Sequence, residues 1–463
     1  MIRNRAFQGS SINRAASLVR NMDHWNHVGE VSLSIDTASP SLSSGLPYQM
    51  RMDVPAGTTG PVGFYNEGFG GFNVNASQTY IARLYMRGDY SGDISCYFHR
   101  NTSDEVLNSA TITVDQTSSD GWKQTYSPTF HPAQTASDAN NTFYFTFDGE
   151  QLAGQSVYFN LLSEFKQTYK NRHNGVRFDM AEALDNLGAN IVHLPGGNNM
   201  EGLYSPYYWK WNETTGSLVD RPGRPDTWGD INTDGFGLLE MMQMAKDLEL
   251  EVILGVWGEL YLNGEIVPEV DLQPYIDSVP DELEAIRPLS SEKNEQPLAF
   301  YDAIHAAYPS INLIPTINPN PISTPPSGSV DLHIYANEAH FTSLFSNFDQ
   351  ASRDYPVFVN EYAATNIDSN TNAEIGAQTF GSSASDYLCC LPNEHYAALP
   401  TFWEVMEARQ TVRILASPDL LHVYCRCGCA IIINYKVDDD FGSYPTSSTD
   451  SLSDPFPYAL ESD

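Results

Sequence analysis

Hydrophobic and polar positions follow two different patterns along the chain, and the change falls near residue 167. Between about Trp25 and Phe165, short alternating runs are separated by turns rich in Gly, Asn and Asp; the runs at 79–86 and 142–147 are examples. This pattern predicts closely spaced strands that form an antiparallel β-sandwich. Whether its aromatic residues form a core or an exposed surface stays open, because the pattern does not separate the two.

After residue 167, predicted helices and strands alternate. The predicted helices are 179–187, 237–248, 298–308 and 338–353, and the predicted strands are 191–194, 251–257, 311–315, 330–335 and 356–363. Strands separated by helices predict right-handed βαβ units and a parallel sheet. Because the unit is repeated in series, we expect a (β/α)₈ barrel with its chemistry at the carboxyl ends of the strands.

One strand end carries a group of residues suited to holding a small polar ligand. The predicted strand 191–194 stops at Pro-Gly-Gly-Asn, which predicts a tight loop at residues 195–198. Asn198 can donate and accept hydrogen bonds, and Trp209 and Trp211 can stack on an apolar ring face. The alternative is a structural loop with core tryptophans. In either case, Arg221 and Arg224 can tie down the long loop that follows.

Two later strand ends carry groups suited to glycoside chemistry. The strand 330–335 brings His333 and Tyr335 to its exit, and the next strand does the same for Glu361. The two positions lie roughly 30 residues apart, about one βα repeat, so the strands are expected to be neighbours. A carboxylate beside a phenol can attack an anomeric carbon. The alternative is a structural Glu in an ion pair.

Charge limits the classes of partner. The 463 residues include 24 basic and 58 acidic side chains, for a formal net charge of −34, which repels nucleic acid and anionic membranes. No run of about 18 apolar residues is present, so no membrane span is predicted. Alternating cysteines at 425–429 lack the spacing of a zinc site, and no metal or cofactor is expected, while a disulfide among them stays open.

The sequence features that bear on secretion disagree with each other. The basic start at residues 1–5 is not followed by an apolar region, so no signal peptide is predicted. Four Asn-x-Ser/Thr motifs nevertheless predict glycosylation of a secreted chain. Their asparagines are Asn75, Asn101, Asn140 and Asn212.

Several motifs in order resemble the fungal-type α-L-arabinofuranosidases of glycoside hydrolase family 51. They are Gly196–Gly202, Trp209–Thr214, Asp220–Arg224 and Asn232–Glu240, and the resemblance extends from residue 1 to about 366. It implies a secreted enzyme that removes terminal arabinofuranose from plant cell-wall polysaccharides such as arabinoxylan and arabinan. It also implies a barrel interrupted near its beginning by a sandwich that resembles a carbohydrate-binding module.

The resemblance also implies roles for single residues. Glu361 falls on the catalytic nucleophile, with Asn360 in place of the family's usual glycine. Tyr335 and His333 fall on the motif that orients this nucleophile, and Asn198 falls on an asparagine that binds the arabinose hydroxyls. The predicted substrate-binding residues are Gly196, Gly197, Asn198, Trp209 and Trp211.

A retaining glycosidase also needs a second carboxyl group, about 5–5.5 Å from the nucleophile. In the family it is the Glu of a Gly-Asn-Glu at the end of the fourth barrel strand. No apolar run for that strand follows the predicted helix 273–286. Glu295, in Asn294-Glu295, is the candidate acid/base, and the alternative is that it belongs to the start of the next helix. Glu259 lies just beyond the strand that ends at Trp257, but the resemblance implies a non-catalytic position for it.

These observations predict an α/β plus all-β chain, an incomplete (β/α)₈ TIM-type barrel with an inserted antiparallel β-sandwich. The predicted parts are a barrel fragment at 1–24, the sandwich at 25–166, the incomplete catalytic barrel at 167–366, and a divergent tail at 367–463 with strands near 420–424 and 430–434. Two functions follow: a retaining α-L-arabinofuranosidase, or a catalytically inactive carbohydrate-binding homologue or incomplete gene product.

Overall fold

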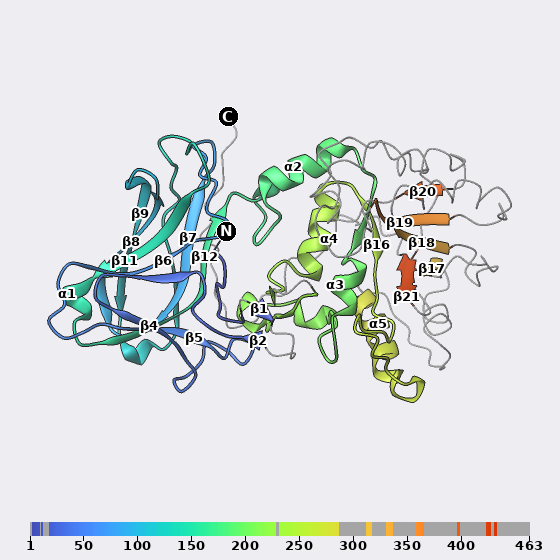
Figure 1. Cartoon of the computed structure of the whole chain (residues 1–463), viewed down its shortest axis with the longest axis horizontal. Coiled ribbons are helices and arrows are strands. Elements are labelled where there is room, and N and C mark those ends of the chain that lie inside the picture. The colour runs from blue at the N-terminus through green and yellow to red at the C-terminus, as the bar shows by residue number, and fades with distance from the viewer. Residues whose placement is uncertain are drawn as a thin grey trace. The chain divides into compact units, whose positions relative to one another are not determined.

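The computed structural model describes residues 2–9, 11–12, 18–227 and 231–286, followed by the backbone of six strands between 312 and 432. These residues fall into two compact units (Figure 1). Unit 1 comprises the described residues up to 178 together with 212–237, and unit 2 comprises 179–211 and those from 238 onward. The helices expected at 298–308 and 338–353 lie outside the described residues.

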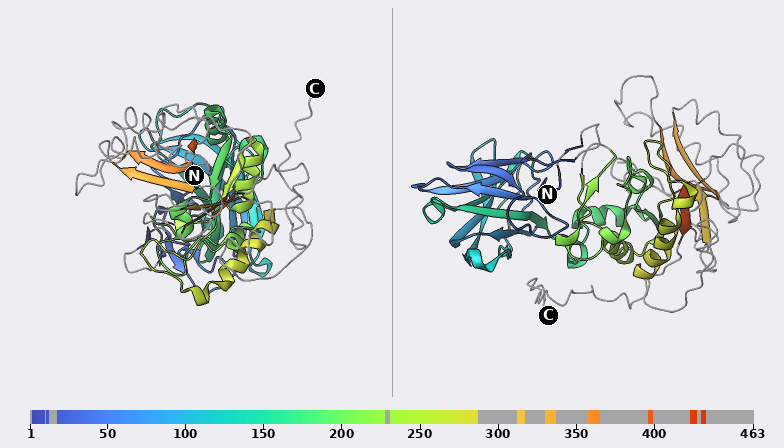
Figure 2. Two further views of the ribbon diagram at one scale, coloured as in Figure 1. Left: turned by 90° about the vertical axis from the view of Figure 1, so that its right-hand side faces the viewer. Right: turned by 90° about the horizontal axis from the view of Figure 1, so that it is seen from below.

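Unit 1 is built from two five-stranded antiparallel sheets, seen as two layers of strands (Figure 1, Figure 2). One sheet has the order β3-β6-β11-β8-β9 and the other β10-β7-β12-β5-β4. The strands are β3 (Trp25–Val28), β4 (Ser32–Asp36), β5 (Gln49–Asp53), β6 (Pro61–Asn66), β7 (Tyr80–Arg87), β8 (Tyr90–Arg100), β9 (Glu105–Gln116), β10 (Lys123–Tyr126), β11 (Asn141–Asp148) and β12 (Ser156–Lys166).

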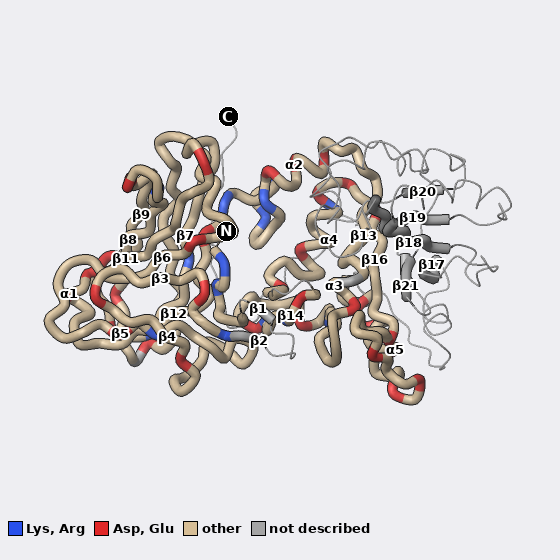
Figure 3. The backbone as a smooth tube through the Cα atoms, in the orientation of Figure 1, with Lys and Arg blue, Asp and Glu red and all other residues tan. Residues whose placement is uncertain are grey.

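Shorter elements complete unit 1, and acidic residues are distributed over both units (Figure 3). The two-residue strands β1 and β2 pair with each other, as do β14 and β15. These elements are β1 (Ser11–Ile12), β2 (Leu18–Val19), β14 (Arg224–Pro225), β15 (Ile231–Asn232), α1 (Gly149–Leu152), η1 (Ser118–Asp120), η2 (Tyr169–Asn171) and η4 (Leu218–Asp220).

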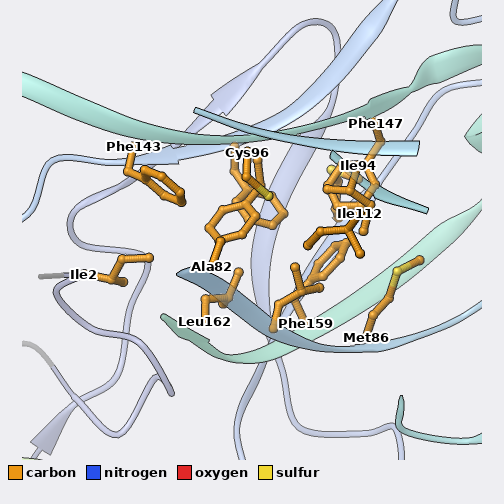
Figure 4. Packing of buried hydrophobic residues seen from close by; sticks show 14 of the residues in the cluster. Ile2, Ala82, Met86, Ile94, Cys96, Ile112, Phe143, Phe147, Phe159 and Leu162 are labelled. Atoms are coloured by element: carbon orange, nitrogen blue, oxygen red, sulfur yellow. The ribbon is translucent and has the colours of Figure 1, made fainter. Parts of the chain in front are cut away.

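The two sheets of unit 1 share one aromatic core. Phe64 of β6 and Phe159 of β12 come from different sheets, and their ring centroids lie 4.9 Å apart at a steep angle. Figure 4 shows Phe143 and Phe147 of one sheet facing Phe159 and Leu162 of the other. All five side chains are buried, and burial of each stabilises the fold by roughly 1.5–3 kcal/mol. The alternating sequence pattern therefore places its apolar positions between the sheets.

Unit 2 contains one eight-stranded sheet with the order β13-β16-β22-β21-β17-β18-β19-β20. Its strands are β13 (Ile191–Leu194), β16 (Glu251–Leu254), β17 (Asn312–Thr316), β18 (Val330–Ala336), β19 (Val357–Ala364), β20 (Tyr396–Ala398), β21 (Val423–Arg426) and β22 (Ala430–Ile432). Its helical segments are α2 (Phe178–Leu187), α3 (Gly197–Glu201), α4 (Leu238–Asp247), α5 (Gln273–Ile286), η3 (Trp211–Glu213) and η5 (Glu269–Asp271).

Most neighbouring strands of this sheet are parallel, as the βαβ pattern predicts. Parallel pairs are β13 with β16, β17 with both β18 and β21, and β19 with both β18 and β20. The exception is β22, which is antiparallel to β16, β17 and β21. The two strands expected in the tail are thus present, and they lie in the sheet between β16 and β17.

The helices of unit 2 use their apolar residues to different extents. In α4, Leu238, Met242 and Ala245 recur at helical spacing and are buried, so one stripe of the helix faces the interior. In α2, Ala181 is buried while the longer apolar side chains are half-buried. The predictions of helices at 179–187 and 237–248 are confirmed, with boundaries within about one residue.

Candidate active site

The neighbouring strands β18 and β19 bring three predicted site residues together. The strands are parallel, and His333 pairs in register with Glu361, while Tyr335 pairs with Ala363. The expected adjacency of the two strand ends is therefore present. His333 lies directly beside Glu361 in the backbone ladder, and Tyr335 lies two residues farther along β18.

A bulge sets this register. Leu332 pairs with Val359, and the next pair is His333 with Glu361, so Asn360 is the extra residue on β19. Bulges of this kind are common beside active sites, where they change the aim of a side chain. Without the bulge, Asn360 would pair with His333, and Glu361 would pair with Ile334 instead. The residue that differs from the family's glycine is thus the one that sets the position of Glu361.

The segment after β13 differs from the expected loop. Pro195 and Gly196 follow the strand, but Gly197 and Asn198 already belong to the first turn of α3. The amide of Met200 donates to the carbonyl of Gly196 at 2.9 Å and closes that turn. Met200 is buried, and this anchor explains why the chain coils here instead of forming an open loop.

The two predicted tryptophans occupy different environments. Trp209 is 4% exposed, and its amide donates to the carbonyl of Met200 at 2.9 Å. Trp211 is half-buried, and its Nε1 donates to Ser278 Oγ of α5 at 2.9 Å. The core interpretation therefore fits Trp209, whereas Trp211 keeps part of its ring accessible.

An aromatic cluster that the sequence analysis did not single out follows β16. Trp257 stacks on Tyr208 with 4.5 Å between ring centroids, and the rings of Tyr275 and Tyr261 lie 4.7 and 5.0 Å from it. Trp257 Nε1 donates to the Glu201 carbonyl at 3.2 Å and so ties this cluster to α3. In the sequence, the high Tyr and Trp content of residues 204–211 is the feature that could have indicated an aromatic cluster here.

A hollow of about 500 Å³ opens beside this cluster. Its lining consists of Tyr208, Val270, Asp271, Pro274 and Tyr275. Two tyrosines next to a carboxylate give a ring surface and an acceptor for hydroxyl groups, which are the features that a sugar contacts.

Glu259 is an unusual carboxyl group beyond the end of β16. Its φ of 98° lies in the left-handed region that non-glycine residues rarely adopt. Burial raises the pKa of its half-buried side chain, and the charge of Glu269 adds to the rise. A raised pKa favours the protonated form of a carboxyl group, and that form can donate a proton. The other candidate, Glu295, lies outside the described residues.

The predicted role of the two loop arginines is confirmed within unit 1. The buried guanidinium of Arg221 donates to the carbonyls of Gly216 at 2.8 Å, Asp234 at 3.0 Å and Gly235 at 3.2 Å. Arg224 Nε lies 3.4 Å from Asp234 Oδ2. These contacts join the two ends of the loop between residues 216 and 235.

Two further findings on the described residues concern metal binding and membrane insertion. Among them, no group of three or more His, Cys, Asp or Glu side chains is placed to hold a metal ion. The helices described here are all too short or too polar to cross a bilayer.

Comparison with known proteins defines first a class and then a family. Residues 183–297 match the family model described as Alpha-L-arabinofuranosidase 1 domain. Alpha-L-arabinofuranosidase A of Aspergillus niger is 36% identical over 408 residues, which cover 80% of this chain and 63% of that protein. A probable alpha-L-arabinofuranosidase A of Emericella nidulans is 30% identical, with 74% of this chain and 67% of that protein covered.

A solved structure extends the likeness to the fold. The arabinose-bound α-L-arabinofuranosidase of glycoside hydrolase family 51 superposes with a TM-score of 0.75 at 30% identity, covering 92% of this chain and 74% of that one. The class is thus that of glycoside hydrolases. The chain belongs to the α-L-arabinofuranosidases of glycoside hydrolase family 51. It spans about 63% of the length of the first curated relatives that it matches.

Proposed function

We propose that this chain is built to remove terminal α-L-arabinofuranosyl residues from arabinoxylan or arabinan with retention of configuration. The observation that carries the proposal is the register of β18 and β19, which pairs His333 with Glu361. Glu361 lies in the carboxyl-terminal half of the parallel strand β19, and the catalytic groups of (β/α)₈ enzymes lie toward that end of their strands. The complete barrel, and a sandwich in unit 1 that resembles a carbohydrate-binding module, belong to this proposal.

In the proposed mechanism, Glu361 attacks the anomeric carbon and forms a glycosyl-enzyme ester as the aglycone oxygen leaves. A second carboxyl group gives that oxygen a proton and later takes one from the attacking water. Glu259, whose pKa is raised by burial, and Glu295 are the candidates for this role. His333 and Tyr335 orient the nucleophile, and the segment Gly196–Asn198 binds arabinose hydroxyls.

Secretion is part of the same proposal. Asn101, Asn140 and Asn212 are exposed and Asn75 is half-buried, so glycosylation motifs occur at accessible positions. Asn101 Nδ2 donates to Asn140 Oδ1 at 3.0 Å, so a glycan on either residue would have to replace this contact.

A second function is favoured by the order of the unit 2 sheet. In a serial βα barrel the strand following α5 would pair with β16, but β22 and β21 lie between β16 and β17. This order agrees with loss of the fourth barrel strand, which in the family carries the acid/base. A sugar-binding protein without turnover is therefore the alternative proposal.

Kinetics with paired substrates distinguish the two proposals and the residue roles. With an aryl arabinofuranoside whose leaving group needs little protonation, we expect a burst of product and a mass increase on the peptide containing Glu361. Glu361→Gln should lose about 10⁴-fold or more in kcat with every substrate. The variant that removes the acid, Glu259→Gln or Glu295→Gln, should lose about 10²–10⁴-fold only with poor leaving groups.

The outcomes separate cleanly. Absence of burst and label in a folded sample that still binds arabinose would favour the sugar-binding protein. Normal turnover by Glu361→Gln would remove the proposed nucleophile.

A further inference from the structure

A basic segment in unit 1 interrupts the strongly acidic chain. Residues 165–178 contain Lys166, Lys170, Arg172 and Arg177 and no Asp or Glu, whereas the whole chain has 58 acidic and 24 basic residues. Figure 3 shows blue stretches in the chain just before α2. Such segregation concentrates positive potential locally, even though the net charge of the molecule repels anions.

The segment is held in a defined conformation. The Tyr169 amide donates to the Val176 carbonyl at 2.9 Å, and Thr168 Oγ1 donates to the Arg172 carbonyl at 2.6 Å. Lys170, Asn171 and Asn174 all have φ near +50°, a region that side chains rarely adopt. Backbone of this kind persists only where surrounding contacts fix it, and it is often found at ligand sites.

A cavity of about 40 Å³ lies at the base of this segment, entirely within unit 1. It has three cationic lining residues, Arg83, Lys166 and Arg172, and its other lining residues are polar or aromatic except for the aliphatic Ile81 and Leu218. The volume suits a carboxylate with an accompanying water rather than a sugar ring. Arg forks and Lys ammonium groups are the usual donors to such a carboxylate.

Ring faces and neutral donors border the same cavity. The Arg83 guanidinium carbon lies 5.7 Å from the Phe165 ring centroid, and Lys166 Nζ lies 6.0 Å from that of Tyr80. Gln167 Nε2 donates to Asn171 Oδ1 at 3.0 Å and holds the rim of the cavity. Rings and amides next to cations match a sugar that carries a carboxylate better than they match a bare inorganic anion.

One acidic side chain lies close by. Glu164 is 3% exposed, and burial raises the pKa of its carboxyl, while the charges of Lys166 and Arg177 oppose that rise. A buried carboxyl that tends to keep its proton cancels less of the neighbouring positive charge than an exposed carboxylate would.

We propose that this cavity binds the carboxylate of a uronic acid unit, so that unit 1 directs the chain to acidic arabinose-bearing polysaccharides. The choice of a polysaccharide as ligand rests on the proposed function. The binding step itself needs no turnover. The site lies on the unit built from the two antiparallel sheets and uses none of the predicted catalytic residues.

Binding of an oligogalacturonide to the full chain tests the proposal. We expect tetragalacturonic acid to bind at least about tenfold more tightly than its fully methyl-esterified form at low salt, because esterification removes the negative charge. The difference should shrink at high ionic strength. Arg172→Gln, which changes an exposed side chain, and Lys166→Gln should each lose most of it. Lys123→Gln is the matched control and should retain the difference, because Lys123 of β10 pairs with Met86 at the end of β7 that lies away from the cavity.

Each other outcome overturns a specific claim. Equal binding of acid and ester, or binding of neither by a folded sample, overturns the carboxylate site. Displacement of the oligogalacturonide by an equal concentration of inorganic phosphate overturns the choice of a sugar acid. Arabinose release is measured separately on a neutral aryl arabinofuranoside. Preference for the acid without arabinose release would therefore overturn the proposed function and leave this inference standing.

Discussion

Arg224 and Asp234 show how burial changes the charge of single residues. The two side chains are buried, with 3.4 Å between Arg224 Nε and Asp234 Oδ2. Burial raises the pKa of Asp234 to about 6 and lowers the pKa of Arg224, although the two groups attract each other. Desolvation therefore outweighs the attraction, as is common for buried ion pairs.

The stability of unit 1 should carry the signature of this titration. Folded Asp234 holds its proton more tightly than the unfolded chain, where the pKa is 3.8. Its contribution is therefore complete below about pH 4 and is lost as the pH rises to about 6. Measured by chemical denaturation, the free energy of unfolding relative to Asp234→Asn should fall by ~3 kcal/mol between pH 4 and pH 7.

The variant leaves Arg224 without an ion partner at both pH values, and the pKa of about 6 already includes the attraction that the native protein gains when Asp234 ionises. The prediction therefore concerns only the change of the difference with pH. If the free energies of unfolding of the native protein and of Asp234→Asn differed by the same amount at pH 4 and pH 7, the raised pKa of Asp234 would be wrong.

For single residues, the sequence predicted which interactions a side chain makes better than it predicted whether that side chain is buried. Arg221 and Arg224 are tied to the loop as expected, because long side chains in a Gly-containing loop have few other anchors. Trp209 and Trp211 were equivalent in sequence, yet one is buried and the other half-buried. Only the packing of α3 and α5 separates them, and that packing depends on residues far apart in the chain.

Among the elements, β19 contributes most to the site. Its bulge at Asn360 places Glu361 beside His333. The sequence pattern predicted both β19 and its pairing with β18. Two β-branched runs that lie one βα repeat apart usually form neighbouring strands of a parallel sheet. The bulge was not predictable, since a one-residue register shift leaves no trace in hydrophobic periodicity.

The bulge can be tested by substitution at Asn360. Asn360→Gly, which restores the family's usual residue, should keep kcat within about threefold because glycine tolerates bulged backbone. Asn360→Val favours a regular ladder, which would move Glu361 out of the row of His333. A displacement of this size should cost about 10²-fold in kcat with an aryl arabinofuranoside. Equal activity of the two variants would show that the register does not depend on the bulge.

Helix α3 shows where element prediction failed. Two glycines after a proline predicted a tight loop, but the chain coils into a helix at Gly197. The helix is held by the buried side chain of Met200 and by the bond from Trp257 Nε1 to the Glu201 carbonyl. Tertiary contacts overrode local propensity here, as they often do for short segments.

For the whole molecule, the sequence pattern changes near residue 167, whereas the structure divides into two compact units along other boundaries. The contact boundary falls at residue 178, and the loop 212–237 belongs to unit 1 instead of the unit that surrounds it in sequence. Arg221 and Gln8 account for this, because Gln8 Nε2 donates to the Arg221 carbonyl at 3.1 Å. A bond across 213 positions has no signature in local pattern.

The tail should be required for the integrity of unit 2. The strands β21 and β22 supply hydrogen-bonding partners to β17, and β22 also supplies one to β16. Removing residues 367–463 deletes these two strands and β20 as well, and so exposes edges of β16, β17 and β19. Exposed edges destabilise a sheet and promote aggregation. We expect hydrogen exchange at the amides of β16 to accelerate by at least about tenfold, while β11 of unit 1 keeps its protection.

A shorter deletion provides the matched control for this experiment. Removing only residues 433–463 leaves β20, β21 and β22 in place, so the protection of β16 should equal that of the full chain. Exchange is best followed by mass spectrometry on peptides that contain Val252 and Ile253, which are both buried in β16. If the two shortened chains protect β16 equally, the tail strands do not hold the sheet together. The sheet must then cover its edge at β16 by other means.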